Sequence, residues 1–176
     1  MLLPSATVER AYPQFSPDGK ELAFIEERNR LMVINWIRKK FVTITDGSTW
    51  FSTDGNFDYQ WSPDGKWFTL EFIGNRHDPY SDIGLVSAKG DSPITNLTNS
   101  GYMSGSPRWV LDGNAILFTT ERYGMRAHAS WGSQNDAMLV FLNQDAFDKF
   151  RLSKEDYELQ KELEKEQKKD KEKSLN

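Results

Sequence analysis

The sequence predicts an all-β fold, a partial β-propeller of about three four-stranded blades with the third incomplete, followed by a charged C-terminal α-helix. A turn motif carries this prediction: its fullest copy is residues 61–66, Trp-Ser-Pro-Asp-Gly-Lys, and weaker copies stand at residues 15–20 and 109–114. The glycines of the three copies, Gly19, Gly65 and Gly113, lie 46 and then 48 residues apart. A fixed period of this length is typical of repeat architectures.

The chemistry of the motif fits a tight turn between two strands. Proline at the second place has its φ already set, aspartate at the third can bond its own backbone, and glycine at the fourth takes a left-handed conformation without steric cost. Such a turn joins two antiparallel strands in a hairpin. The third copy keeps only Asp112-Gly113, and we expect this pair to carry the unusual backbone angles.

The flanks of the turn repeat in the same register. An aromatic residue stands four places before each glycine: Phe15, Trp61 and Trp109. An apolar pair follows three and five places after each glycine: Leu22 and Phe24, Phe68 and Leu70, Ile116 and Phe118. These runs predict strands covered on both faces, as in propeller blades stacked face to face. The alternative is three unrelated hairpins with common turn chemistry, and the constant register argues against it.

The predicted blades cover residues 12–46, 57–98 and 105–142, within a domain of residues 1–150. In the first blade we expect strands up to residue 16 and at 21–26, 31–34 and 40–45. In the second we expect them at 58–62, 66–73, 83–87 and 94–97. In the third we expect them at 107–110, 115–120 and 137–142, with no fourth strand.

Residues 151–176 form a charged helical tail in this prediction. Residues 143–150 already have helical spacing, and Ser153 with Asp156 three places on is an N-cap signal for the helix that follows. A coiled coil is the alternative for the tail, but Leu159 and Leu163 alone do not make a heptad repeat.

Composition excludes several classes of protein. The net charge of −4 argues against a nucleic-acid partner, which needs a concentrated basic surface. The chain has no cysteine, so we expect no disulfide framework and no thiolate metal site. It has no long apolar run that predicts a membrane span, and its start is too short for a signal peptide. Because the first repeat begins almost at once, we expect an excised piece of a longer protein; the compartment stays unknown.

A catalytic set of serine, histidine and carboxylate is not evident. The two histidines are His77 and His128, and the serines nearest His128 are Ser130 and Ser133. No Gly-x-Ser-x-Gly elbow is present. Loop serines and surface histidines are therefore favoured over an autonomous hydrolase that uses His128 and Ser130.

A second candidate site is a calcium-binding loop. Asp54, Asn56 and Asp58 have the required spacing, but Tyr59 stands where the loop needs glycine and Gly65 where it needs glutamate. The sequence therefore predicts no metal site here and no bound cofactor.

The loop of residues 74–82 is longer than a hairpin needs. One histidine and two aspartates in it, His77, Asp78 and Asp82, are weak evidence for a metal. Loops longer than the minimum are nevertheless where function concentrates.

Arg76 and Arg122 are the candidate peptide-binding residues. Each follows the second strand of its blade, and the arginine fork suits a carboxylate such as the C-terminus of a peptide. The alternative is a structural arginine paired with Glu121 or with a loop carbonyl.

Two longer stretches resemble a known family. They are residues 121–133, Glu-Arg-Tyr-Gly-Met-Arg-Ala-His-Ala-Ser-Trp-Gly-Ser, and residues 141–155, Phe-Leu-Asn-Gln-Asp-Ala-Phe-Asp-Lys-Phe-Arg-Leu-Ser-Lys-Glu. With the turn repeat, which resembles the TolB-type propeller repeat, they are similar to the N-terminal propeller of bacterial tricorn-like serine peptidases. The resemblance covers essentially the whole chain, but no residue matches the family's catalytic motifs.

The resemblance implies a non-catalytic propeller portion that guides or filters peptide substrates, or scaffolds the enzyme, within a serine-peptidase parent. Implied partners are peptides or unfolded polypeptide and the remaining domains of the protease, with self-association through open blade edges, no nucleic acid and no membrane span. The family favours the periplasm or cell envelope. The alternative is a stand-alone TolB-type interaction module with no protease attached.

Overall fold

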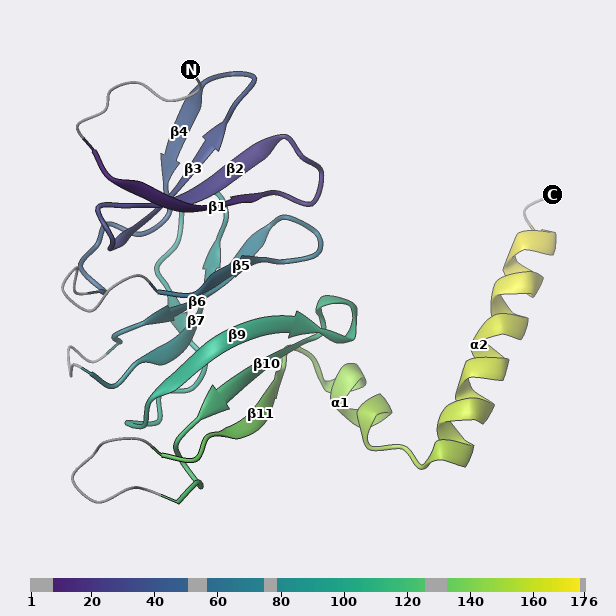
Figure 1. Ribbon diagram of the computed structural model, residues 1–176. Helices are drawn as coiled ribbons and strands as arrows, with labels where there is room; N and C mark the ends of the chain where they lie inside the picture. Colours follow the sequence, from purple (N-terminus) through teal and green to yellow (C-terminus); the bar gives the residue numbers. More distant parts are fainter. Residues whose placement is uncertain (1–7, 51–56, 75–78, 126–132, 175–176) are drawn as a thin grey trace. The chain divides into compact units, whose positions relative to one another are not determined.

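The computed structural model describes residues 8–50, 57–74, 79–125 and 133–174. The chain forms two compact units, Met1–Val140 and Phe141–Asn176. The first unit holds the sheets, and the second is helical after the end of the last strand (Figure 1).

The first unit contains three sheets, and strands that are neighbours in a sheet are also consecutive in the chain (Figure 1). The first sheet consists of β1 (Arg10–Phe15), β2 (Glu21–Glu26), β3 (Arg30–Asn35) and β4 (Lys40–Thr43). The second consists of β5 (Tyr59–Trp61), β6 (Trp67–Phe72), β7 (Asp82–Ser87) and β8 (Thr95–Asn96). The third consists of β9 (Ser104–Val110), β10 (Ala115–Thr120) and β11 (Asp136–Phe141). The predicted all-β fold, with two four-stranded blades and an incomplete third, is confirmed.

The turn motif closes the first hairpin of the first two sheets as its chemistry predicts. The amide of Gly19 donates to the carbonyl of Ser16 at 2.9 Å, and that of Gly65 donates to Ser62 at 2.9 Å. This is the bond from the first to the fourth residue of a β-turn. Gly19 and Gly65 have φ of 70° and 68°, the left-handed region that favours glycine.

The third turn differs from the first two. Asp112 and Gly113 have φ of 54° and 84°, as expected for this pair, but Leu111 also has a positive φ, 52°. Residues Leu111–Gly113 form a short 3₁₀ turn, η2. Proline fixes a negative φ at the second place of the other two copies. Its absence leaves Leu111 at that place able to adopt the left-handed conformation.

The sheets bury their apolar side chains against each other. One cluster joins the first sheet to the second: Ala23, Ile25, Leu31 and Val33 with Tyr59, Trp61, Phe68, Leu70 and Phe72. Another joins the second sheet to the third: Ile83, Leu85 and Leu97 with Trp109, Ile116, Phe118, Met138 and Val140. Burial of this apolar area, worth ~25 cal/mol per Å², holds the first unit together and fixes which faces of the sheets meet.

The strand β9 is longer than predicted and contains a bulge. It begins at Ser104, three residues before the strand predicted at 107–110, because Ser104 and Gly105 pair with Thr120 and Thr119 of β10. The register then shifts before Arg108. The bulge takes up Ser106, which has φ of 53°, and Pro107, which has no N–H to give to a ladder.

The second unit contains two helices, α1 (Gln144–Phe150) and α2 (Lys154–Ser174). The side chain of Asn143 caps α1 by accepting from the amide of Ala146 at 2.8 Å. Ser153 caps α2 by accepting from the amide of Asp156 at 3.1 Å, the contact that the sequence predicted. Within the part of the chain that the structure describes, no helix combines the length and apolar character that crossing a membrane requires.

Candidate functional site

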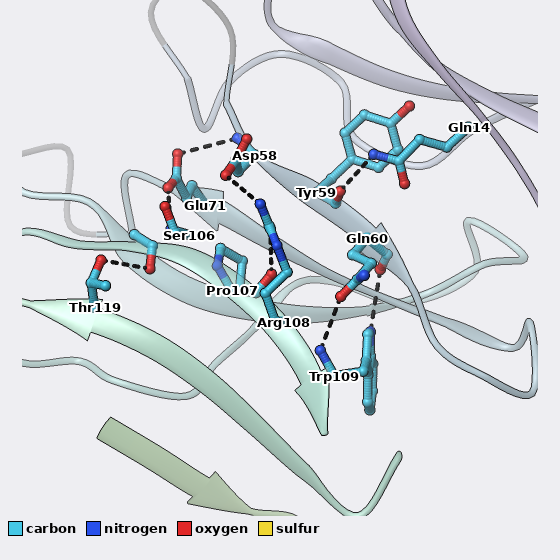
Figure 2. A network of polar contacts seen from close by, with 11 residues as sticks. Gln14, Asp58, Tyr59, Gln60, Glu71, Ser106, Pro107, Arg108, Trp109 and Thr119 are labelled. Atoms are coloured by element: carbon cyan, nitrogen blue, oxygen red, sulfur yellow. Dashed lines mark hydrogen bonds and ion pairs between the residues drawn. The ribbon is translucent and has the colours of Figure 1, made fainter. Parts of the chain in front are cut away.

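The strands β1, β5 and β9 come from three different sheets and are linked by a repeated polar contact. The indole nitrogen of Trp61 donates to the backbone carbonyl of Gln14 at 3.2 Å. In return the side-chain amide of Gln14 donates to the carbonyl of Tyr59 at 3.0 Å (Figure 2). The Tyr59 hydroxyl donates to the carbonyl of Tyr12, and burial raises the pKa of this hydroxyl. These contacts tie the second sheet to the first along one edge.

The same contact recurs between the second and third sheets. The indole nitrogen of Trp109 donates to the carbonyl of Gln60 at 3.3 Å, and the side-chain oxygen of Gln60 accepts from the backbone amide of Trp109 at 2.9 Å (Figure 2). Glutamine directly precedes the aromatic residue in the first two repeats, whereas the third has Arg108 in that place. The aromatic residue of the turn motif is therefore a link between sheets as well as a core side chain.

A half-buried carboxylate lies beside this edge. Glu71 of β6 accepts from the backbone amide of Ser106 at 2.6 Å and from that of Asp58 at 3.1 Å (Figure 2). Burial raises the pKa of Glu71, and the two amide hydrogen bonds offset part of that rise. Glu71 therefore bridges the start of the second sheet and the bulge of β9 through a single charged group.

Arg108 supplies a positive charge on the same edge. Its guanidinium lies 3.4 Å from the carboxylate of Asp58 and also donates to the carbonyl of Pro107 at 2.8 Å (Figure 2). Both members of this ion pair are about half exposed, so water screens the pair and its contribution to stability is small.

A cavity of about 600 Å³ opens between the second and third sheets, next to Glu71. Its polar wall comes from the start of β9 and the end of β10, with Ser104, Ser106 and Glu121. Its apolar wall includes Trp50, Ile73 and Met103. None of the described residues that line it carries a positive charge. Polar side chains outnumber apolar ones among these lining residues, and the volume of the cavity lies in the usual range of ligand pockets, roughly 300–1,000 Å³.

Of the two candidate arginines, the structure describes one. Arg122 is exposed and directly follows Glu121, which lines the cavity. Its guanidinium lies 5.3 Å from the centre of the Tyr123 ring, and no ion pair joins Arg122 to Glu121. Arg76 lies outside the described residues.

The residues weighed for catalysis and metal binding are only partly described. His77, Asp78, His128, Ser130, Asp54 and Asn56 lie outside the described ranges. Asp82 is 3% exposed and accepts from the side-chain amide of Asn96 at 2.8 Å and the hydroxyl of Thr98 at 2.7 Å, so it holds β8 against β7. The described residues contain no group of three or more metal-binding side chains.

Sequence reasoning missed Glu71 and the two glutamines. The glutamines are detectable from the sequence, because Gln14 and Gln60 occupy the same position in the repeat. Glu71 is not detectable in this way, because the first repeat has the apolar Ile25 at the same position. Its role depends on the bulge of β9. The first repeat has a matching bulge at Tyr12 and Pro13 of β1, where Tyr12 has φ of 54°.

Comparison with known proteins finds similarity to a peptidase in sequence. No family model matches the chain. The uncharacterized peptidase YuxL of Bacillus subtilis (strain 168) is 32% identical over 122 residues, which cover 65% of this chain but only 18% of YuxL. The chain thus spans about a fifth of the length of the curated relative it matches.

Solved structures share the fold. The tricorn protease matches 76% of this chain with a TM-score of 0.58 and 13% identity, over 14% of its own length. A prolyl endopeptidase matches 81% with a TM-score of 0.56 and 18% identity, over 22% of its own length. The chain is therefore similar to parts of peptidases in sequence and in fold.

Proposed function

We propose that this chain is a non-catalytic β-propeller portion of a tricorn-like serine peptidase, built from TolB-type repeats, which binds peptide substrates and guides them towards a catalytic domain elsewhere in the protein. The similarity to a peptidase in sequence and to two peptidases in fold supports the association with proteolysis. The cavity between the second and third sheets is the observation that carries the binding role.

The cavity offers what an extended peptide needs. A peptide backbone requires hydrogen-bonding groups along its path, and its side chains require apolar pockets at intervals. Ser106 and Glu121 supply the former, and Trp50 and Met103 supply the latter. Arg122, exposed beside the cavity-lining Glu121, is positioned in the chain to pair with a peptide carboxylate.

Peptide binding without cleavage is the direct test. A fluorescently labelled, unstructured neutral peptide should bind the full chain saturably, and mass spectrometry should find that peptide intact after prolonged incubation. Asn135 is exposed and lines the cavity, so Asn135→Trp should obstruct it and weaken binding at least about tenfold. Arg122→Ala should weaken binding of a peptide with a free C-terminus more than binding of its amidated form.

A matched control separates obstruction from a general effect of added bulk. Ser92 is exposed and lines neither this cavity nor the groove described below, so Ser92→Trp should leave peptide affinity unchanged. No saturable binding by the parent chain, or an equal loss in both variants, would refute the proposed role.

A further inference from the structure

A second hollow, a groove of about 540 Å³, lies between the first and second sheets. It shares no lining residue with the cavity beside Glu71. One wall comes from β3 and β4 and the turn between them, and the other from the start of β6 and the end of β7. It therefore lies at the end of β6 opposite to the cavity.

The charge of this groove is unlike that of the whole chain. Among the described residues, four lysines and arginines line it, Arg38, Lys40, Lys66 and Lys89, but only one acidic residue, Glu21. The net charge of the whole chain is −4. A local excess of positive charge on an acidic protein concentrates anions at that place.

Most of these charges lack a protein partner. Lys66 lies 3.5 Å from the carboxylate of Asp64, and both side chains are more than half exposed. Among the described residues, Arg38, Lys40 and Lys89 form no ion pair. Like charges that converge on one hollow repel each other, and a ligand carrying several negative charges relieves that repulsion.

The floor of the groove is apolar. Trp67 lines it and is 41% exposed, beside Val42 and Ala88. An indole face next to cations suits a ligand that carries both carboxylates and apolar groups. A simple inorganic anion would use only the charges, whereas an acidic stretch of polypeptide would use both.

The walls are held in place by backbone contacts. The amide of Ala88 donates to the carbonyl of Lys66 at 2.9 Å. Gly90, at φ of 67°, packs so closely on β4 that a Cβ there would lie 2.3 Å from the carbonyl oxygen of Thr43. The groove is therefore formed by the packing of two sheets, and its shape does not depend on a bound ligand.

We propose that this groove binds an acidic segment of polypeptide, with its carboxylates on Arg38, Lys40, Lys66 and Lys89 and an apolar side chain on Trp67. The inference rests on the proposed function only in taking polypeptide as the ligand. It adds a preference: the chain recruits substrates that are rich in aspartate and glutamate, through a surface separate from the cavity.

Two peptides that differ only in charge test this preference. Both are amidated at the C-terminus, and one carries four glutamates around a leucine where the other carries four glutamines. The acidic peptide should bind the full chain at least about tenfold more tightly, and its affinity should fall steeply between low and high salt as the Debye length shortens from ~30 Å at 0.01 M to ~3 Å at 1 M.

The repeat supplies a matched control for the charges. Lys20 and Lys66 follow the glycine of their turns and each pairs with the turn aspartate, at 3.1 and 3.5 Å, but only Lys66 lines the groove. The double variant Lys66→Gln/Lys89→Gln should weaken binding of the acidic peptide about fivefold or more. Each variant removes one exposed ion pair with the peptide, and the two losses in affinity multiply. Lys20→Gln should not weaken it.

Three results would overturn the inference. Equal affinity for the two peptides, or an equal loss in Lys20→Gln, would show that the groove does not select acidic polypeptide. A short single-stranded oligonucleotide that displaces the acidic peptide at lower concentration than the peptide itself would assign the groove to another class of ligand. If the neutral peptide still binds and Asn135→Trp still blocks it, the proposed function stands while this inference fails. If the chain still prefers the acidic peptide but Asn135→Trp does not weaken binding of the neutral peptide, the inference stands and the proposed function fails.

Discussion

The indole nitrogen of Trp61 donates a hydrogen bond to the backbone carbonyl of Gln14, 3.2 Å away, and so joins the second blade to the first. One repeat later Trp109 makes the same bond to Gln60 at 3.3 Å. The tryptophan of the turn motif therefore donates a hydrogen bond between sheets, which a phenyl ring cannot do. Phe15 holds the corresponding place in the first repeat and is 64% exposed, in keeping with the absence of such a bond.

Trp61→Phe should lower the free energy of unfolding by about 2 kcal/mol. Roughly 1 kcal/mol comes from the lost hydrogen bond, and a similar amount from the smaller ring in a site where Trp61 is only 6% exposed. Urea unfolding measures the change. Trp67→Phe is the matched control, because Trp67 is 41% exposed, and it should cost less than about 0.5 kcal/mol; equal costs would contradict the role given to Trp61.

Glu71→Gln should change how stability depends on pH. Burial raises the pKa of Glu71, so around that pKa the folded state holds more protons than the unfolded state. The contribution of this group is then full at low pH and is lost as pH rises from about its ordinary value of 4.5 through the raised value. Urea midpoints of both proteins from pH 4 to pH 8 should show this decline in the parent chain and its removal in Glu71→Gln. Parallel curves would contradict it.

Ser16→Ala should raise the pKa of Asp18. The hydroxyl of Ser16 donates to the Asp18 carboxylate at 2.8 Å, and the amide of Lys20 donates to it at 3.1 Å. These bonds lower the pKa of Asp18 from 3.8 to about 2. A lowered pKa gives stability that is present above pH 3.8 and is lost as pH falls towards 2.

Carbon-detected NMR titration of the side-chain carboxyls measures this pKa directly. In Ser16→Ala the pKa of Asp18 should move back towards 3.8, while that of Asp64, in the second turn, should stay lowered by its own serine, Ser62. An Asp18 titration that is the same in both proteins would show that the serine does not hold the turn.

Two glycines with the same backbone conformation should respond differently to alanine. Gly19 and Gly90 have φ of 70° and 67°, but a Cβ on Gly19 meets nothing within 4 Å, whereas one on Gly90 lies 2.3 Å from the carbonyl oxygen of Thr43. Gly19→Ala should cost about 1 kcal/mol of backbone strain. Gly90→Ala should cost about 2–3 kcal/mol, because the sheets must also move apart. Thermal unfolding of both variants tests the close contact between the first two sheets.

Much of this architecture is local enough to be predicted from the sequence. The turns are encoded by proline and glycine at fixed places, and the strands by the apolar pairs that follow, such as Phe68 and Leu70. The caps of the helices are encoded by Asn143 and Ser153, whose side chains act within three residues of their own position. The failure of the pattern at Leu111 follows from the lost proline.

The cavity and the basic groove could not be predicted in the same way. Each is formed by residues from two sheets, so its shape depends on how far apart the sheets pack and on the bulge at Ser106. Lys66 and Lys89 are ordinary turn lysines in the sequence, and only the fold brings them together with Arg38. Arg122 follows a strand in the sequence, and that position does not reveal whether its side chain faces a cavity.

The central claim is that the chain holds a peptide between its second and third blades. A two-dimensional NMR titration with an unlabelled neutral peptide tests it most directly, because it reports where the peptide binds. The account predicts saturable shifts for the amides of Ser104, Gly105 and Ser106 and for the indole of Trp50, with the amides of β2 and β3 unmoved. Saturable shifts elsewhere in the first unit, with these four signals unchanged, would contradict it.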